Sequence, residues 1–221
     1  MFSIMYAAIS ADIVSSTSLS KDAMIELTEK LRGILCLLED RYEGFWGRIV
    51  RGDSIECIMP KAVDALEIAI LLKAFVKSFT PKDGQGLKQF HKYGLRVAIG
   101  IGEMKTVDKT LDMLDGEAIY RSGRELDKLV GRSKFSFVLS MENTEKETAL
   151  QLMLSLVNHL LNKATARKCQ VLCERILAKD SNEVAQRMGI SVSGVNQTLK
   201  DIGWDLIEQV IDYYRKITTN I

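Results

Sequence analysis

Two aspartates stand where the hydrophobic pattern of the sequence gives way to turns. Asp12 follows the apolar run Phe2 to Ala11, and Asp53 lies in the tight connection Arg51-Gly52-Asp53 between two short apolar segments. If these segments belong to one sheet, both carboxylates emerge at the same edge. Adjacent carboxylates repel each other, and the repulsion is relieved either by a raised carboxyl pKa or by a divalent cation that prefers oxygen ligands, such as Mg²⁺. The pair Asp12 and Asp53 therefore predicts a Mg²⁺ site.

A structural explanation of the same residues remains open. Asp12 could cap the turn that follows it, through Ser15 or Ser16, because short polar side chains hydrogen-bond to nearby backbone groups. Asp53 could be present only because Gly-Asp suits the turn of a hairpin. The two explanations differ in whether the carboxylates meet in space.

Residues 181–202 have the pattern of a helix-turn-helix. Ser181 is expected to cap a short helix, Gly189 to supply the positive φ of a turn, and Ser191 to cap a second helix. Apolar side chains at helical spacing are expected to face the interior: Val184, Ala185, Met188, Val195, Leu199 and Ile202. Several independent matches at fixed offsets thus favour this motif.

The second helix of this motif has an outward face that could read DNA. The predicted DNA-contacting residues are Ser191, Ser193, Asn196, Gln197 and Lys200. Asparagine and glutamine can pair bidentately with adenine, and serine can meet several base edges, when the front of such a helix enters the major groove. The partner implied is therefore DNA.

The charge of this region keeps a second interpretation open. Residues 163–221 contain nine basic and seven acidic residues, a net charge of only +2, and so few cations give weak binding to phosphates. The alternative is a helical module for protein contacts. A homodimer would offset the weakness by placing two recognition helices about 34 Å apart.

The composition excludes several classes of protein. The chain has 221 residues, of which 47% are hydrophobic and 27% charged, as in an ordinary globular protein. Its net charge of +1 excludes a general polycation. The longest apolar runs are much shorter than the roughly 20 residues that a bilayer requires, and Asp12 interrupts the N-terminal apolar stretch, unlike in a signal peptide. We expect a cytoplasmic protein with no membrane partner.

Hydrophobic periodicity predicts an alternating first part and an all-helical last part. The predicted elements are strand 2–11, helix 20–42, strands 47–50 and 54–59, helix 61–79, loop 80–93, strand 95–101, helix 117–129 and strand 135–140. This order indicates an α+β fold, ferredoxin-like βαββαβ with an extra unit, whose antiparallel sheet carries helices on one face. The expected domains are 1–141, a connecting helix 142–162, and an all-α helix-turn-helix domain 163–221.

Four segments together resemble the class III nucleotidyl cyclase fold: residues 11–20, 47–53, 95–102 and 115–124. The resemblance spans about residues 5 to 140. It implies that Asp12 and Asp53 hold two Mg²⁺ ions, which activate a ribose hydroxyl and neutralise charge on the α-phosphate. It further implies a nucleotide bound by Ser15, Ser16, Arg51 and Gly52, with Arg124 as a catalytic residue.

At two positions the chain departs from the cyclase pattern. Tyr120 stands where the family has an asparagine four residues before the arginine, and Ile49 stands where it has the base-selecting lysine. A bulky phenol cannot orient a ribose as a carboxamide does. These departures disfavour cyclase catalysis, so an active purine nucleotidyl cyclase with two aspartate-bound metal ions is the alternative rather than the first hypothesis.

A closer resemblance is to the SatD family, a relative of the cyclase fold with a C-terminal helix-turn-helix. It is carried by residues 12–15, 52–53, 100–103 and 115–118 together with Arg124. The resemblance implies a DNA-binding transcriptional regulator. Its cyclase-like domain would bind a nucleotide with Mg²⁺ or mediate dimerisation.

Overall fold

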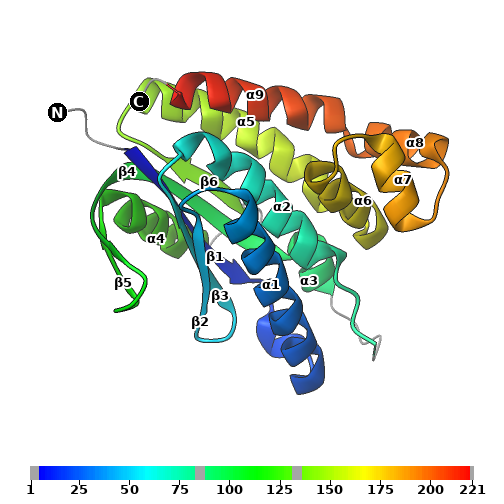
Figure 1. The fold of residues 1–221 in the computed structure, drawn as a ribbon, viewed down its shortest axis with the longest axis horizontal. Helices are drawn as coiled ribbons and strands as arrows, with labels where there is room; N and C mark the ends of the chain where they lie inside the picture. The colour runs from blue at the N-terminus through cyan, green and yellow to red at the C-terminus, as the bar shows by residue number, and fades with distance from the viewer. Residues whose placement is uncertain (1–4, 83–87, 131–135, 220–221) are drawn as a thin grey trace.

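The computed structural model describes residues 5–82, 88–130 and 136–219. Its strands form one six-stranded sheet (Figure 1). They are β1 (Met5–Ile13), β2 (Trp46–Val50), β3 (Ser54–Met59), β4 (Leu95–Asp108), β5 (Met113–Gly116) and β6 (Phe137–Ser140). The order is β2-β3-β1-β4-β5, all antiparallel, and β6 pairs in parallel with the first half of β4. The chain is therefore a mixed α/β protein, as the sequence predicts.

The helices of the first part are separated by short connections. They are the 3₁₀ turn η1 (Ser16–Ser18), α1 (Lys21–Arg41), η2 (Ala62–Asp64), α2 (Ala65–Ser78), α3 (Lys88–Tyr93) and α4 (Glu117–Val130). The last part consists of α5 (Thr144–Lys163), α6 (Ala166–Leu177), α7 (Ser181–Met188), α8 (Val192–Ile202) and α9 (Trp204–Thr218). In the part of the chain that the structure covers, no helix is both long and apolar enough to span a bilayer.

Helices cover both faces of the sheet, which corrects the expectation of helices on one face. Alternate residues of β1 point to opposite faces. Ile9 and its neighbours at spacing two pack with α1 and α2, whereas Ala8 packs with Ala118 of α4. Figure 1 shows α4 on one side of the strands and α1 and α2 on the other. The sequence conceals this arrangement because α4 needs only small residues beneath it.

Two further expectations need correction. The segment 80–93 was expected to be a loop, yet its end forms α3, where Phe90 is buried against Phe79 with ring centroids 6.3 Å apart. Strand β4 runs beyond Ile101 to Asp108, and β5 pairs with this extension. Positions 2–4 of the first predicted strand, Gly84 and Gly86 of the predicted loop, and Phe135 of the last predicted strand lie outside the described residues.

The C-terminal helices share a single hydrophobic core with the sheet. Helix α2 is buried on nearly all sides, between the sheet and α6, and α5 packs on β6. Polar contacts reinforce this packing: Arg41 of α1 donates to the backbone oxygens of Leu177 at 2.8 Å and Ile176 at 3.3 Å, at the end of α6. The Tyr214 hydroxyl of α9 donates to the oxygen of Ala62 at 2.7 Å.

Candidate functional site

Asp12 lies within β1, one residue before its end, whereas the sequence predicted a strand that stops at Ala11. Its partners across the strands are Ser54 on β3 and Arg96 on β4. Directly opposed residues of antiparallel strands project from the same face. Ser10, two residues earlier on that face, lies 2.8 Å from the hydroxyl of Ser122 on α4. The Asp12 carboxylate therefore lies on the α4 side of the sheet.

Arg96 holds the Asp12 carboxylate in a two-pronged ion pair. Its Nε donates to Oδ1 at 2.8 Å and to Oδ2 at 3.1 Å, and its Nη2 also donates to Oδ2. The side chains are only 19% (Asp12) and 22% (Arg96) exposed. A forked guanidinium contact of this kind is the strongest form of carboxylate pairing. Both oxygens of Asp12 are thus engaged by a cation of the protein.

Asp53 lies in the β2–β3 turn and is tied to the end of β1. Its backbone oxygen accepts from the amide of Ile13 at 3.0 Å, and its Oδ2 accepts from the Ser16 hydroxyl at 2.9 Å. The turns that carry Asp53 and follow Asp12 are therefore neighbours at one end of the sheet. The Asp53 carboxylate points to Ser16 and the Asp12 carboxylate to Arg96.

The backbone at this end of the sheet adopts unusual conformations. Ser15 has φ 56°, Arg51 has φ 53° and Gly52 has φ 84°. A positive φ is unfavourable for residues other than glycine, and such strain often accompanies binding sites. Nothing lies within 4 Å of the place where a Cβ of Gly52 would be, so space is open above the turn.

A pocket of about 550 Å³ opens beside Asp53, between η1, α1 and the β2–β3 turn. It is lined by Ser16, Leu19, Lys21, Met24, Ile25, Thr28, Glu29, Arg32 and Gly52. Two of the four residues that the sequence suggested for a nucleotide, Ser16 and Gly52, line it, and Ser15 and Arg51 directly adjoin them in sequence. The pocket combines an apolar wall with two cationic side chains, Lys21 and Arg32, and one carboxylate, Glu29. Because cations outnumber carboxylates there, the pocket suits a flat ring with attached anionic groups.

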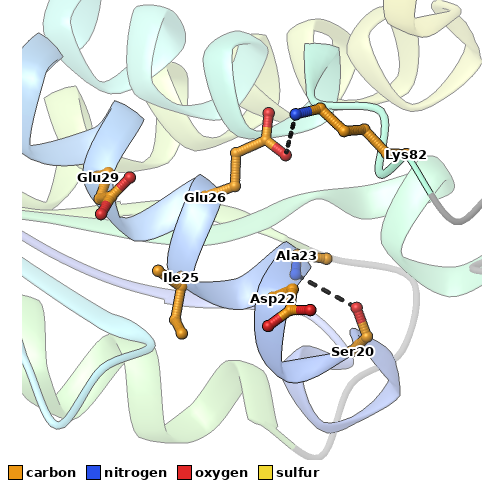
Figure 2. Close-up of a pocket in the computed structure, with 7 residues that line it drawn as sticks. All are labelled: Ser20, Asp22, Ala23, Ile25, Glu26, Glu29 and Lys82. Carbon is orange, nitrogen blue, oxygen red and sulfur yellow. Dashed lines mark hydrogen bonds and ion pairs between the residues drawn. The ribbon is translucent and has the colours of Figure 1, made fainter.

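A second hollow of about 540 Å³ adjoins the first along α1 and shares Ile25 and Glu29 with it. Figure 2 shows its lining, with Lys82 reaching toward Glu26 at 4.0 Å and Ser20 accepting the Ala23 amide at 3.2 Å. Asp22, Glu26 and Glu29 face a single lysine there. Because carboxylates outnumber cations, this hollow is poorly suited to an anion such as a phosphate.

The residues suggested for cyclase chemistry have other contacts. The Arg124 guanidinium lies over the Tyr120 ring, 6.0 Å from its centroid, and the Tyr120 hydroxyl donates to the carboxylate of Asp115. This hydrogen bond raises the pKa of Tyr120 above its usual value. Ile49 packs against the hydrophobic core. Arg124 is thus placed by α4 beside an aromatic ring, and its contact is with Tyr120 rather than with Asp12 or Asp53.

The donor chemistry of the two aspartates suits Mg²⁺, but their present contacts do not leave both free to bind it. Among the described residues, no three histidine, cysteine, aspartate or glutamate side chains come together to hold a metal ion. Mg²⁺ is often held by one or two carboxylates when phosphates complete its shell. Asp53 could serve in this way, whereas Asp12 would first have to leave Arg96.

A second candidate surface is the α7–α8 pair. The cap of α7 is Asp180 rather than Ser181, because the Asp180 carboxylate accepts the amides of Asn182 at 2.8 Å and Glu183 at 3.0 Å. Gly189 ends the helix with φ 63°. After a short turn, the Ser191 hydroxyl accepts the Gly194 amide at 3.1 Å and begins α8. Each end of the turn thus has a local signal that the sequence already displays.

The outward face of α8 is polar and exposed. Val195, Leu199 and Ile202 are buried, whereas all five residues suggested for DNA contacts are exposed: Ser191, Ser193, Asn196, Gln197 and Lys200. The Ser191 hydroxyl accepts the hydrogen bond that caps α8, and the Gln197 amide donates to Asp201 at 2.8 Å. Asp201 is also paired with Lys168 at 3.2 Å. Asn196 and Lys200 project from this face into solvent.

Two lysines are buried beside the strand that carries Arg96. Lys73 donates to the backbone oxygens of Tyr93 at 2.8 Å and Leu95 at 2.5 Å and to the Ser136 hydroxyl at 2.8 Å. Lys77, one turn later on α2, donates to the oxygens of Lys92 at 2.9 Å and of Leu161 on α5. Burial lowers the pKa of Lys73 to about 7 and that of Lys77 to about 8.

These lysines predict a stability that rises with pH. Between about pH 7 and 8.5, an unfolded lysine still holds a proton that the folded lysine has released, so the unfolded state binds more protons and the free energy of unfolding increases. Each lysine contributes up to about 1.4 kcal/mol per pH unit. Urea unfolding at pH 6.5, 7.5 and 8.5 should show the rise, and Lys73→Met should make it shallower. A flat or falling wild-type profile would contradict this expectation.

Sequence reasoning missed Arg96, Lys21 and Arg32. Arg96 was visible as one charged residue inside an apolar strand, which is a signal of a partner on the same face of the sheet. Its partner follows from the register of β1 against β4, which no local pattern gives. Lys21 and Arg32 carry no signal of their own, since charged residues on the exposed face of a helix are ordinary.

Comparisons with known proteins give distant likenesses. No model of a known protein family matches the chain, and no curated protein does. A solved structure of a bacterial light-regulated adenylyl cyclase is 14% identical with a TM-score of 0.40, covering 63% of this chain and 77% of that chain. A second structure of such a cyclase is 15% identical with a TM-score of 0.42, covering 62% and 43%.

A third solved structure is the dimeric guanylyl cyclase domain of the RhoGC fusion protein from the aquatic fungus Blastocladiella emersonii. It is 18% identical with a TM-score of 0.45, covering 67% of this chain and 84% of that chain. These structural neighbours are nucleotidyl cyclases, the class of fold that the N-terminal sequence resembles. With TM-scores of 0.40 to 0.45 and identities of 14% to 18%, these likenesses carry no argument about the site or the activity of this chain.

Proposed function

We propose that the chain is a sequence-specific DNA-binding regulator of the SatD type, with α8 as its recognition helix. The observation that supports this proposal is the division of α8 into a buried apolar face and an exposed face with Asn196, Gln197 and Lys200. Amide side chains can read adenine, and a lysine can contact a phosphate or guanine. The flanking caps at Asp180 and Ser191 fix where both helices begin.

Local ion pairs neutralise several acidic residues of the C-terminal region that would otherwise repel DNA phosphates. Asp201 is paired with Lys168, Glu208 with Arg175 at 3.5 Å, and Asp212 with Arg215 at 3.5 Å. Acidic groups that are already neutralised repel phosphates less. The remaining positive charge is modest, so we expect binding that is weak on random DNA and strongly dependent on salt concentration.

The test is selection of a sequence from a random-sequence duplex pool, followed by affinity measurements on the selected and a scrambled duplex. Asn196→Ala with Gln197→Ala should reduce discrimination between the two duplexes about tenfold or more, since each bidentate contact contributes about 1–3 kcal/mol. The matched control is Asn182→Ala with Gln186→Ala, which removes the same two side-chain types from the exposed face of α7. It should leave discrimination unchanged.

Failure to enrich any sequence would contradict the DNA-binding proposal. Equal losses in both double variants would also count against base readout by α8. Either result would favour the alternative of a helical module for protein contacts.

We further propose that the pocket beside Asp53 binds a nucleotide. Ser16, Gly52, Lys21 and Arg32 place hydrogen-bond donors, open space and positive charge around one cavity. Mg²⁺ would be held there by Asp53 with the phosphates, and by Asp12 only after release from Arg96. Calorimetry with ATP, GTP and cyclic nucleotides, with and without Mg²⁺, tests this proposal, and Arg32→Ala should weaken any binding.

The cyclase alternative receives less support from these contacts. The two-metal reaction requires both aspartates as ligands, but Arg96 engages both oxygens of Asp12, and Tyr120 is turned to Asp115. Incubation with ATP or GTP and Mn²⁺, followed by chromatography, decides the matter. A cyclic product that Asp12→Ala abolishes would establish the alternative.

A further inference from the structure

Helix α5 presents leucines to solvent on the side opposite to its buried face. Leu152 is 67% exposed and Leu156 is 68% exposed, whereas Leu150, Leu154 and Leu161 are buried. At about 100° per residue, Leu152 and Leu156 lie within about 40° of a line that is diametrically opposite to the buried face. This apolar stripe is therefore not the edge of the core but a separate surface.

Helix α9 extends this surface. Leu206 is 57% exposed and Tyr213, seven residues later, is also exposed. The two helices run antiparallel, since Lys146 near the start of α5 donates to the oxygen of Ile217 near the end of α9. Between them lies a largely apolar groove of about 330 Å³, lined in part by Leu156, Leu160, Leu206, Val210 and Tyr213. Contiguous exposed apolar surface of this kind marks an interaction site.

The charges on α5 indicate which partner fits. Glu145 and Lys163 are exposed and stand 18 residues apart, which is five full turns, so both lie on the line of the stripe. Glu145 is seven residues before Leu152, and Lys163 is seven residues after Leu156. The stripe thus has an acid at one end, a base at the other, and two leucines placed symmetrically about its middle.

Such a stripe is complementary to its own antiparallel copy. A two-fold axis at position 154 brings position 145 of one helix opposite position 163 of the other, and position 152 opposite position 156. In an isologous dimer each such contact occurs twice. The two charges are roughly 27 Å apart along one helix, so they cannot neutralise each other within one chain.

We propose that the protein forms a homodimer in which the α5 helices of two copies pack antiparallel. Leu152 contacts Leu156 of the partner subunit, Glu145 pairs with Lys163 of the partner subunit, and the groove between α5 and α9 receives apolar side chains of the other copy. The interface resembles a four-helix arrangement of two α5–α9 pairs. This inference stands independently of DNA binding, because it depends only on α5 and α9.

The first experiment measures mass by sedimentation equilibrium across a range of concentrations. The wild type should have twice the mass of the chain, and Leu152→Glu with Leu156→Glu should raise the dimer dissociation constant at least tenfold. Because both positions are about two-thirds exposed, the substitutions leave the fold intact, which circular dichroism checks. The matched control is Leu111→Glu, at a 70% exposed leucine between β4 and β5, which should leave the dimer unchanged.

The second experiment exchanges the charges. Glu145→Lys and Lys163→Glu should each weaken the homodimer, because each places like charges opposite one another. Mixing the two single variants should restore dimerisation as a heterodimer, and the double exchange should restore it as a homodimer. A monomeric wild type, a dimer that persists in the double-leucine variant, or charge variants that fail to rescue each other would overturn the proposal.

Discussion

Gly100→Ala should lower the free energy of unfolding by about 3 kcal/mol, near the upper end of the usual cost of overpacking. A Cβ at this position of β4 would lie 2.2 Å from the oxygen of Ala118 and 2.5 Å from the amide nitrogen of Ser122. Both are backbone atoms of α4, so the helix as a whole would have to move away. The Ser10–Ser122 hydrogen bond would be lost with it.

The control for this substitution is Gly123, which lies on α4, the helix that Gly100 contacts. Gly123 faces open space, with nothing within 4 Å of the position that a Cβ would take. Gly123→Ala should therefore stabilise the protein by about 1 kcal/mol, through helix propensity alone. Urea unfolding of both variants measures the two effects. If Gly100→Ala cost less than about 1 kcal/mol, α4 would not be seated on β4 as closely as described.

Arg96→Met should have two opposite effects. It should lower stability by about 2 kcal/mol in the absence of divalent cations, because it leaves the partly buried Asp12 carboxylate without its counter-charge. It should also make stability depend on Mg²⁺, because the freed carboxylate becomes available beside Asp53. Ligand binding to the folded state stabilises it by mass action, by about 1 kcal/mol when Mg²⁺ is several times its dissociation constant.

Thermal unfolding with increasing MgCl₂ measures the second effect. The wild type should respond weakly and Arg96→Met more strongly. The control, Asp12→Asn combined with Arg96→Met, removes the charge pair together and should lose the response. If the unfolding temperature of the single Arg96→Met variant did not change with MgCl₂, Asp12 and Asp53 would not act together as metal ligands.

Strong periodicity made most elements predictable. The strand 54–59 has the predicted bounds, and α1 and α4 begin where their polar first turns indicate. The bounds are reliable there because Ser20 and Pro60 mark them with local chemistry. The prediction of helices on one face was wrong because it followed from the order of strands and helices alone, and that order does not show that the face with Ala8, Ser10 and Gly100 is covered. Small residues instead let α4 approach closely.

The candidate site was predictable in its parts but not in its contacts. The neighbouring positions of Asp12 and Asp53 follow from the order of the strands, whereas the Arg96 clamp depends on the register of β1 against β4. Register is set by many long-range contacts and cannot be read from one segment. The burial of Lys73 was not predicted for the same reason, since its three acceptors are Tyr93 at the end of α3, Leu95 at the start of β4 and Ser136 just before β6.

The packing of α6 on α2 has a consequence for how any signal could travel. Arg41 of α1 is hydrogen-bonded to the end of α6, Tyr214 of α9 to Ala62 in η2, and Lys77 of α2 to the end of α5. Helix α8 therefore belongs to a region that is packed rigidly against the sheet domain, and it is not attached through a flexible linker. In the proposed homodimer, an effector bound at the β1 end would therefore have to rotate one whole subunit relative to the other about the two-fold axis.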